Sequence, residues 1–155
     1  TLSMILLEKH ILSDKFEISA SDLSEGVLAS AKRAVYNSYS VRKIPEPYMK
    51  KYFSNSSQSY TINDSVKNTV KFMKVNLIDN KSMAFLRGMD IIFCRNVLIY
   101  MSDEAILKLC GNFHEALSDS GYLFIGSSES LIQKTNLFVP KYQKGIIVYK
   151  KNLKA

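Results

Sequence analysis

The stretch DIIFCRNVLIYMSDEA, residues 90–105, constrains the fold of this chain more than any other segment. After Asp90 it has a continuous apolar run at residues 91–94, which is typical of a strand covered on both faces. It then carries the polar pair Arg95 and Asn96, and a few residues later it begins a helix with Ser102 as the predicted N-cap. A buried strand that leads into a helix is the repeating unit of α/β proteins with a mainly parallel sheet.

The rest of the chain alternates predicted strands and helices in the same way. Residues 1–12 predict an amphipathic helix rather than a secretion signal, because a basic start and a small-residue cleavage site are lacking. Ser24 predicts a second helix start, and the 3.6-residue apolar period of that helix extends to Val35. Other predicted elements are strands at residues 15–22, 89–94, 122–126 and 145–151, a helix at 102–117, a loop with a short helical turn at 43–53, and a polar linker at 54–59.

Residues 60–75 predict an antiparallel hairpin that interrupts this alternation. Tyr60 and Ile62 alternate with polar residues, Asn63 and Asp64 form the predicted turn, and a second apolar run follows. The hairpin would be an inserted arm on the α/β fold.

Composition excludes several classes of protein. Hydrophobic residues make up 46% of the 155 residues, which is enough for a core, and no apolar run reaches the roughly 18 residues of a membrane span. The net charge is +7, but the basic residues are scattered, so a solvated surface is favoured over a nucleic-acid stripe. Cys94 and Cys110 match no metal spacing and predict buried free thiols in a reducing cytoplasm.

Polar residues follow several predicted strands, and ligands of α/β sheets bind beyond the carboxyl ends of the strands. Asp22 could accept the two hydroxyls of a ribose, or it could be an ordinary turn or cap residue. Asn76 could pair with a purine edge while Leu77 covers the face of the base. By itself each signal is weak.

Arg95 and Asn96 follow the most apolar strand directly, and both are costly to bury without partners. They should therefore face a polar cavity or a ligand, or else tie neighbouring loops together. Tyr100 could pack as a core aromatic residue or direct its hydroxyl toward the same cavity.

Together these segments closely resemble the S-adenosylmethionine-dependent methyltransferases of bacterial chemotaxis, the CheR family. The most specific runs are CRNVLIY at 94–100 and GSSESL at 126–131. Residues 19–36 resemble the family's second-strand segment, and VNLID at 75–79 resembles its adenine-side segment. The resemblance covers essentially the whole chain and implies a Rossmann-like methyltransferase sheet with a small inserted antiparallel β arm.

The resemblance also implies residue roles. It assigns five residues to the binding of S-adenosylmethionine and its product S-adenosylhomocysteine: Asp22, Asn76, Leu77, Arg95 and Asn96. Tyr100 would lie near the transferred methyl group as the catalytic residue, and no metal is implied. Glu129 has no firm ligand role, and a hydrogen bond that braces a loop is expected of it. Cys94 is expected to be a small buried residue rather than a nucleophile.

The start of the chain departs from the family pattern. Residues 1–10 resemble the helix that follows the family's first strand and glycine-rich loop. We therefore expect residues 1–155 to be the C-terminal portion of the methyltransferase domain, with residues 44–75 as the inserted β-subdomain, and to be inactive alone. Without the first strand, either a strand-swapped dimer or a deformed pocket is expected. Residues 54–68 lack the glycines of members that grip a receptor peptide.

The leading hypothesis is a protein-glutamate O-methyltransferase that acts on the cytoplasmic domains of chemoreceptors. The alternative is a non-catalytic module that binds a nucleotide or serves as a scaffold. A methyltransferase for small molecules or nucleic acid is a weaker third reading. Neither a nucleic-acid partner nor membrane insertion is expected, and the expected location is the cytoplasm.

Overall fold

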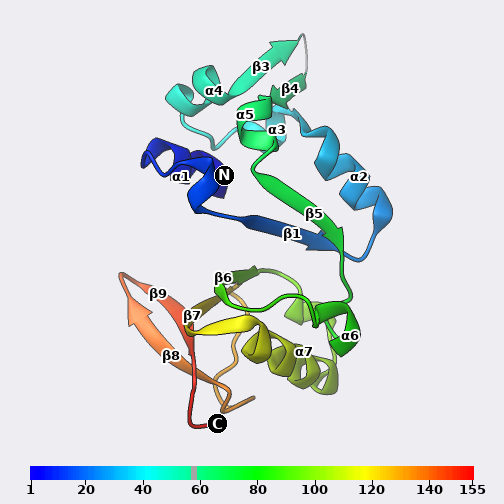
Figure 1. The fold of residues 1–155 in the computed structure, drawn as a ribbon, viewed down its shortest axis with the longest axis vertical. Coiled ribbons are helices and arrows are strands. Elements are labelled where there is room, and N and C mark those ends of the chain that lie inside the picture. Colours follow the sequence, from blue (N-terminus) through cyan, green and yellow to red (C-terminus); the bar gives the residue numbers. More distant parts are fainter. Residues whose placement is uncertain (57–58) are drawn as a thin grey trace. The chain divides into compact units, whose positions relative to one another are not determined.

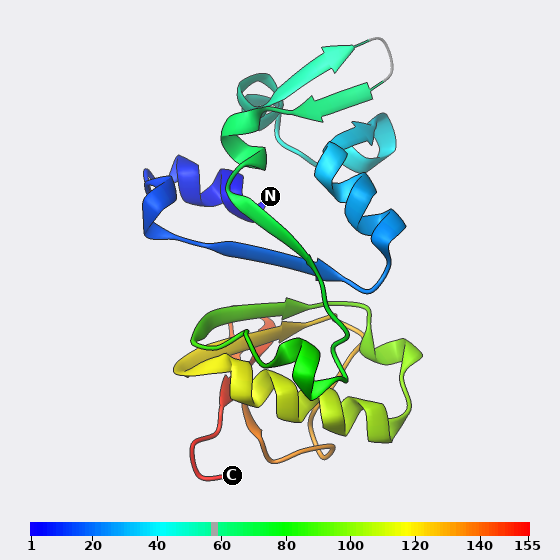
Figure 2. The same ribbon diagram turned by 45° about the vertical axis from the view of Figure 1, so that its right-hand side comes forward.

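The computed structural model describes residues 1–56 and 59–155, which form two compact units, Thr1–Val75 and Asn76–Ala155 (Figures 1 and 2). None of the described helices is long and apolar enough to cross a membrane. Each unit is described separately.

The first unit is built on a pair of parallel strands, β1 (Ile18–Asp22) and β5 (Val70–Lys74). Before β1 lie α1 (Leu2–Glu8) and the 3-10 turn η1 (Ser13–Lys15), and after it comes α2 (Glu25–Arg33). Ser24 caps α2, because its Oγ accepts a hydrogen bond from the Val27 amide at 3.3 Å.

The first unit also contains a three-stranded antiparallel sheet in the order β2 (Val35–Asn37), β4 (Ser59–Ile62), β3 (Phe53–Ser56). Short helices α3 (Ser38–Val41), α4 (Glu46–Tyr52) and α5 (Asp64–Lys67) surround it. One core cluster joins the first helix to this sheet and its helices: Met4, Val41, Tyr52, Phe53 and Val66.

The second unit is a four-stranded mixed sheet in the order β6 (Met89–Cys94), β7 (Leu117–Ile125), β9 (Ile146–Lys151), β8 (Phe138–Gln143). Strands β6 and β7 are parallel, and the other neighbours are antiparallel. Helix α7 (Asp103–Ala116) lies along β7 (Figure 2), and α6 (Asn80–Met83) and the 3-10 turn η2 (Leu98–Tyr100) are short. The apolar face of α7 is almost fully buried: Ile106, Leu109, Cys110, Phe113 and Ala116.

The structure confirms the strands β1, β6, β7 and β9. It confirms a helix at the start only over Leu2–Glu8, so residues 9–12 of the predicted helix lie beyond its end. It also confirms Ser102 as the N-cap of α7, since its Oγ accepts a hydrogen bond from the Ala105 amide at 3.3 Å. The predicted class, an α/β chain with parallel strands, is present as a mixture of parallel and antiparallel pairs.

The predicted hairpin at residues 60–75 is wrong. Strand β4 pairs with β2 and β3, whereas β5 pairs with β1 in the parallel sheet. Asn63 does not form a tight turn but precedes the short helix α5, which separates the two strands. Of the predicted polar linker, residues 54–56 and 59 belong to β3 and β4, and residues 57 and 58 lie outside the described part of the chain.

Three smaller predictions also need correction. Helix α2 ends at Arg33 because Ala34 adopts a left-handed conformation with φ of 55°, so Val35 enters β2 instead of the helix. Strand β6 is not covered on both faces, since Ile91 is 53% exposed and Phe93 is 48% exposed. Strand β8 was not predicted, and the polar residues 118–121 extend β7 rather than forming only a turn.

Candidate cofactor-binding site

Two neighbouring strand ends form the most organised part of the candidate site. Cys94 of β6 lies opposite Ile125 of β7, so both parallel strands end at the same level. The next residues are Arg95 on one strand and Gly126 on the other. The side chains of Arg95 and Asn96 are exposed, so the second unit leaves both groups accessible at its surface.

The carboxylate of Glu129 links these two strand ends. Its Oε2 accepts hydrogen bonds from the amides of Asn96 at 2.9 Å and Gly126 at 2.5 Å. Its Oε1 accepts from the amides of Val97 and Leu98, both at 2.8 Å. A carboxylate offers about four lone-pair positions, and all are used here by backbone donors. This confirms the expected bracing role of Glu129.

The surroundings of Glu129 favour its charged form. Burial opposes ionisation and is the largest single influence, but the backbone N–H groups of Asn96, Gly126, Val97 and Leu98 together outweigh it. The pKa of the Glu129 carboxyl therefore lies below its ordinary value.

Cys94, the last residue of β6, is unsuited to nucleophilic chemistry. Burial raises the pKa of its thiol to about 12, and the negative charge of Glu129 acts in the same direction. With this raised pKa, the Cys94 thiol stays protonated at neutral pH. It therefore lacks the thiolate, which is the nucleophilic form. It is a small buried residue, as expected.

Tyr100 ends the turn η2, six residues after β6. Its side chain is 83% exposed, so the structure excludes the alternative in which it packs in the core. The buried side chain of Leu98 anchors the same turn at 5% exposure. The hydroxyl of Tyr100 is therefore presented to solvent within the second unit.

The Asn76–Leu77 segment is held from α7. Asn76 folds onto its own turn, where its Oδ1 accepts from the Ile78 amide at 3.2 Å. Asn112 of α7 is only 3% exposed, and its Nδ2 donates to the Leu77 carbonyl at 2.8 Å. Asn112 thus fixes the backbone of a predicted site residue, although it lies 35 positions further along the chain.

Asp22 is the last residue of β1 in the first unit. Its Oδ1 accepts a hydrogen bond from the Ser24 amide at 2.8 Å, which is a local turn interaction just before α2. The turn role weighed from the sequence is therefore real. A ribose role is compatible with it, because a carboxylate has two oxygens.

The structure groups the predicted residues in three places. Arg95, Asn96 and Tyr100 share one segment of the second unit, Asn76 and Leu77 share another, and Asp22 belongs to the first unit. Sequence reasoning missed two supporting residues, Asn112 and Gly126. A polar residue on the apolar side of α7 was a usable signal for Asn112, because buried polar groups need partners.

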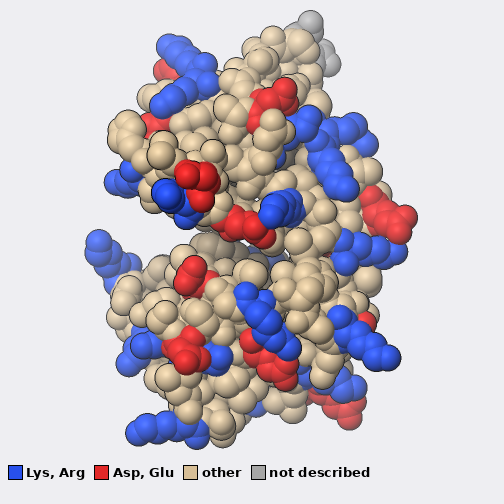
Figure 3. All heavy atoms as spheres, viewed as in Figure 1, with Lys and Arg blue, Asp and Glu red and all other residues tan. Residues whose placement is uncertain are grey.

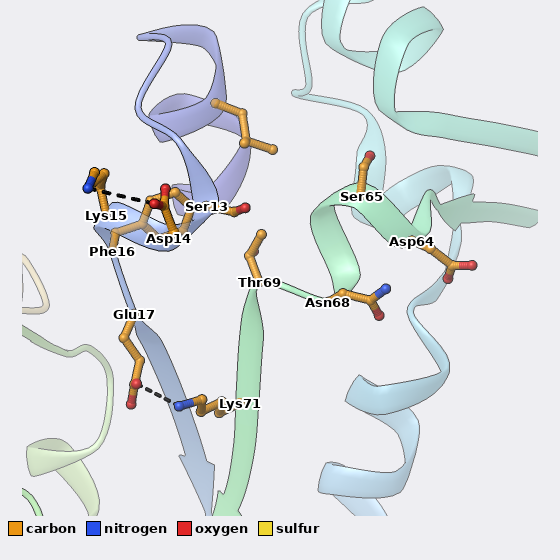
Figure 4. Close-up of a pocket in the computed structure, with 11 residues that line it drawn as sticks. Ser13, Asp14, Lys15, Phe16, Glu17, Asp64, Ser65, Asn68, Thr69 and Lys71 are labelled. Atoms are coloured by element: carbon orange, nitrogen blue, oxygen red, sulfur yellow. Dashed lines mark hydrogen bonds and ion pairs between the residues drawn. The ribbon is translucent and has the colours of Figure 1, made fainter.

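The first unit also has a cavity of about 890 Å³ (Figure 4). Residues from α1, η1, α5, the beginning of β5 and the segment just before β1 line it, so it lies at the opposite end of β1 from Asp22. Figure 4 shows that charged groups on its wall pair with one another, Lys71 with Glu17 at 2.6 Å and Lys15 with Asp14 at 3.6 Å. None of the predicted site residues lines it.

The surface charges and the possible metal ligands concern both units. Figure 3 shows lysine and arginine side chains spread over the visible face of each unit and interspersed with acidic ones. Within residues 1–56 and 59–155, no cluster of three or more His, Cys, Asp or Glu residues has an arrangement that could hold a metal ion.

Comparison with known families identifies the family of the chain. A family model described as "CheR methyltransferase, SAM binding domain" matches residues 1–145. The mixed α/β structure is consistent with an S-adenosylmethionine-dependent methyltransferase fold. The chain belongs to the CheR methyltransferase family, and S-adenosylmethionine is its cofactor.

Several relatives are named as chemotaxis protein methyltransferases. The chain is 36% identical to chemotaxis protein methyltransferase 2 of Vibrio cholerae over 136 residues, which is 86% of this chain and 47% of the relative. It is 33% identical to a chemotaxis protein methyltransferase of Borreliella burgdorferi over 142 residues, which is 88% of this chain and 50% of the relative. The chain thus spans about half the length of these relatives.

Proposed function

We propose that the protein containing this chain transfers a methyl group from S-adenosylmethionine to glutamate side chains in the cytoplasmic domains of chemoreceptors. The family match over residues 1–145 carries this proposal. The names of these relatives, chemotaxis protein methyltransferases, support the chemotaxis setting. The product on the receptor would be a glutamyl methyl ester, and the enzyme a protein-glutamate O-methyltransferase.

The residues at the strand ends have the chemistry that this cofactor needs. Asp22 would accept the ribose hydroxyls, Asn76 and Leu77 would border the adenine, and Arg95 and Asn96 would line the pocket after β6. When bound, S-adenosylmethionine supplies an electrophilic methyl group on a sulfonium sulfur. Tyr100 would lie near that methyl group with its exposed hydroxyl.

The chain's own contribution would be alignment rather than proton transfer. A glutamate acceptor has a pKa of roughly 4.3 and is already ionised at neutral pH, so no strong general base is required. Holding the acceptor oxygen in line with the methyl group makes the step effectively unimolecular, which is a large source of rate acceleration. Backbone groups fixed by Glu129 and Asn112 suit this task, because they keep the strand-end loops in one conformation.

The Rossmann-like character of the fold is part of the proposal. Each unit contains one pair of parallel strands whose connection passes through helical segments, β1 to β5 and β6 to β7. Parallel neighbours joined in this way are typical of doubly wound sheets.

Transfer of radiolabelled methyl groups tests the proposal. The full-length protein, S-adenosylmethionine labelled in the methyl group, and membranes that contain chemoreceptors should give label on the receptor that is released as methanol by alkali. Receptors whose acceptor glutamates are replaced by alanine serve as the control. A protein that binds S-adenosylhomocysteine by calorimetry but transfers no label would instead support the non-catalytic alternative.

A further inference from the structure

We propose that Glu129 is a positioning residue of this methyltransferase, whose carboxylate fixes the backbone of residues 95–98 so that Arg95 and Asn96 are presented to the cofactor. The inference rests on the proposed function, and it goes beyond a bracing contact. It assigns to Glu129 a measurable share of cofactor affinity without any contact between Glu129 and the cofactor.

The geometry requires a carboxylate. Both oxygens of Glu129 accept two backbone donors each, at distances from 2.5 to 2.9 Å. A glutamine of the same shape has one carbonyl oxygen and one NH₂ group, and the NH₂ group would face two N–H donors. An aspartate keeps both oxygens but is one methylene shorter, so it cannot reach the four donors from the same backbone position.

The loop that Glu129 holds contains an unusual backbone conformation. Asn96 has φ of 60°, a left-handed conformation that is uncommon outside glycine and that asparagine adopts more readily than most residues. Three consecutive amides, those of Asn96, Val97 and Leu98, all point at the one carboxylate. Consecutive N–H groups that converge in this way form an anion-binding nest. Here the anion belongs to the chain itself, and it stabilises the unusual backbone.

The neighbouring strand end is shaped for the same carboxylate. A Cβ at Gly126 would lie 2.6 Å from Glu129 Oε2 and 3.2 Å from the Asn96 amide nitrogen. Real Cβ atoms essentially never show a contact of 2.6 Å, and a contact of 3.2 Å is tighter than most, so a larger residue would displace the carboxylate or the loop. Gly126 and Glu129 therefore act together to join the ends of β6 and β7.

Glu129 leaves the ligand-binding groups free. The carboxylate of Glu129 accepts hydrogen bonds from the backbone amides of residues 96–98 and Gly126, while the side chains of Arg95 and Asn96 are exposed. Since its own lone pairs are all used by the chain, Glu129 has no acceptor left for the cofactor. Its lowered pKa keeps it ionised at neutral pH, which agrees with a permanent structural anion.

The test compares Glu129→Gln with Lys151→Met in the full-length protein. Lys151 donates to the Leu117 carbonyl at 2.9 Å at the start of β7, the end of the strand opposite to Gly126. Its side chain is 13% exposed, so its loss should also destabilise the second unit. Calorimetry should show that Glu129→Gln weakens S-adenosylhomocysteine binding on the order of tenfold to a hundredfold, whereas Lys151→Met leaves the dissociation constant unchanged.

A second variant and three outcomes decide whether Glu129 positions the loop for the cofactor. If Glu129→Gln fails to fold, Gly126→Ala replaces it, and the same loss of affinity is expected because the same contact is broken. Cofactor affinity equal to wild type in a folded Glu129→Gln protein would overturn the inference, as would equal losses in Glu129→Gln and Lys151→Met at matched stability. A wild-type protein that binds no S-adenosylhomocysteine at all would instead refute the proposed function.

Discussion

The ends of β6 and β1 carry predicted cofactor residues, but the two strand ends are fixed in different ways. After β6, the backbone of residues 96–98 is held by Glu129, which is 31 to 33 positions further along the chain. After β1, Asp22 holds its own turn through the Ser24 amide two residues later. The first strand end depends on the folded sheet, whereas the second depends mainly on local sequence.

This difference has a consequence for mutations. A change near β6 should alter stability and cofactor affinity together, because one carboxylate serves both the junction of two strands and the loop. A change at Asp22 should alter cofactor affinity more than stability, because only one exposed turn interaction is lost.

The largest expected effect is a loss of stability at the contact between Gly126 and Glu129, which joins the ends of β6 and β7. Gly126→Ala should lower the free energy of unfolding by about 3 kcal/mol, because the new methyl group overpacks a site with no room. Gly111→Ala is the matched control, since Gly111 lies inside α7 with nothing within 4 Å of the added carbon. That control should gain about 0.5–1 kcal/mol from better helix propensity. Urea unfolding measures both, and equal stability of the two variants would contradict the comparison.

The next effect is a loss of cofactor affinity at Asp22, which holds its own turn after β1. Asp22→Ala in the full-length protein should weaken S-adenosylhomocysteine binding by about 1–3 kcal/mol, the typical cost of losing hydrogen bonds to a charged group. Asp22→Asn separates the two roles, because an asparagine still accepts from the Ser24 amide but lacks the charge. We expect Asp22→Asn to keep wild-type stability and to lose affinity in calorimetry. Wild-type affinity in both variants would leave Asp22 with its turn role alone.

Tyr100→Phe should have a smaller effect, and only on turnover. Its hydroxyl is exposed, so the free energy of unfolding should stay within about 0.5 kcal/mol of wild type. A loss of about 1 kcal/mol in transition-state stabilisation would lower kcat and kcat/KM together by roughly fivefold. A lowered kcat in steady-state methyl transfer, together with an unchanged dissociation constant for S-adenosylhomocysteine, would support the role. Wild-type kcat would show that the hydroxyl contributes nothing.

The smallest effect at neutral pH is the pH dependence of the unfolding free energy that Glu129 contributes. Its pKa is lowered on folding, so the stability it contributes is complete above the unfolded pKa of roughly 4.3 and is lost as pH falls through the lower folded pKa. The difference in unfolding free energy between wild type and Glu129→Gln should therefore be constant from pH 7 to about pH 5 and shrink below about pH 4. Urea titrations at each pH measure it. A difference that already falls between pH 7 and pH 6 would contradict this assignment.

The elements predicted best from the sequence are those with local signals. Ser102 before α7 and Ser24 before α2 marked both helix starts, because a cap is formed by residues three positions apart. The hairpin at residues 60–75 failed because the partner of β5 is β1, and register with a distant strand leaves no local signal. Likewise the left-handed Ala34 that ends α2 is buried, and its carbonyl accepts a hydrogen bond from the distant Ile62 amide at 3.0 Å, which local propensity does not predict.

The same division applies to the site. Arg95 and Asn96 were proposed as cofactor-binding residues because polar residues stand out directly after an apolar strand, and the structure places both exposed at the end of β6. Asn112 and Gly126 could not be assigned a role, because their partners, Leu77 and Glu129, become neighbours only after folding. The two alternatives for the missing first strand, a strand-swapped dimer or a deformed pocket, stay predictions.

Hydrogen–deuterium exchange of the full-length protein with and without S-adenosylhomocysteine tests the central claim most directly, namely that the cofactor binds at the strand ends. We predict slower exchange at residues 22–24, 76–78 and 95–100, and no change at residues 13–17 and 64–71, which border the cavity of the first unit. Protection of the cavity residues without protection of the strand ends would contradict the account.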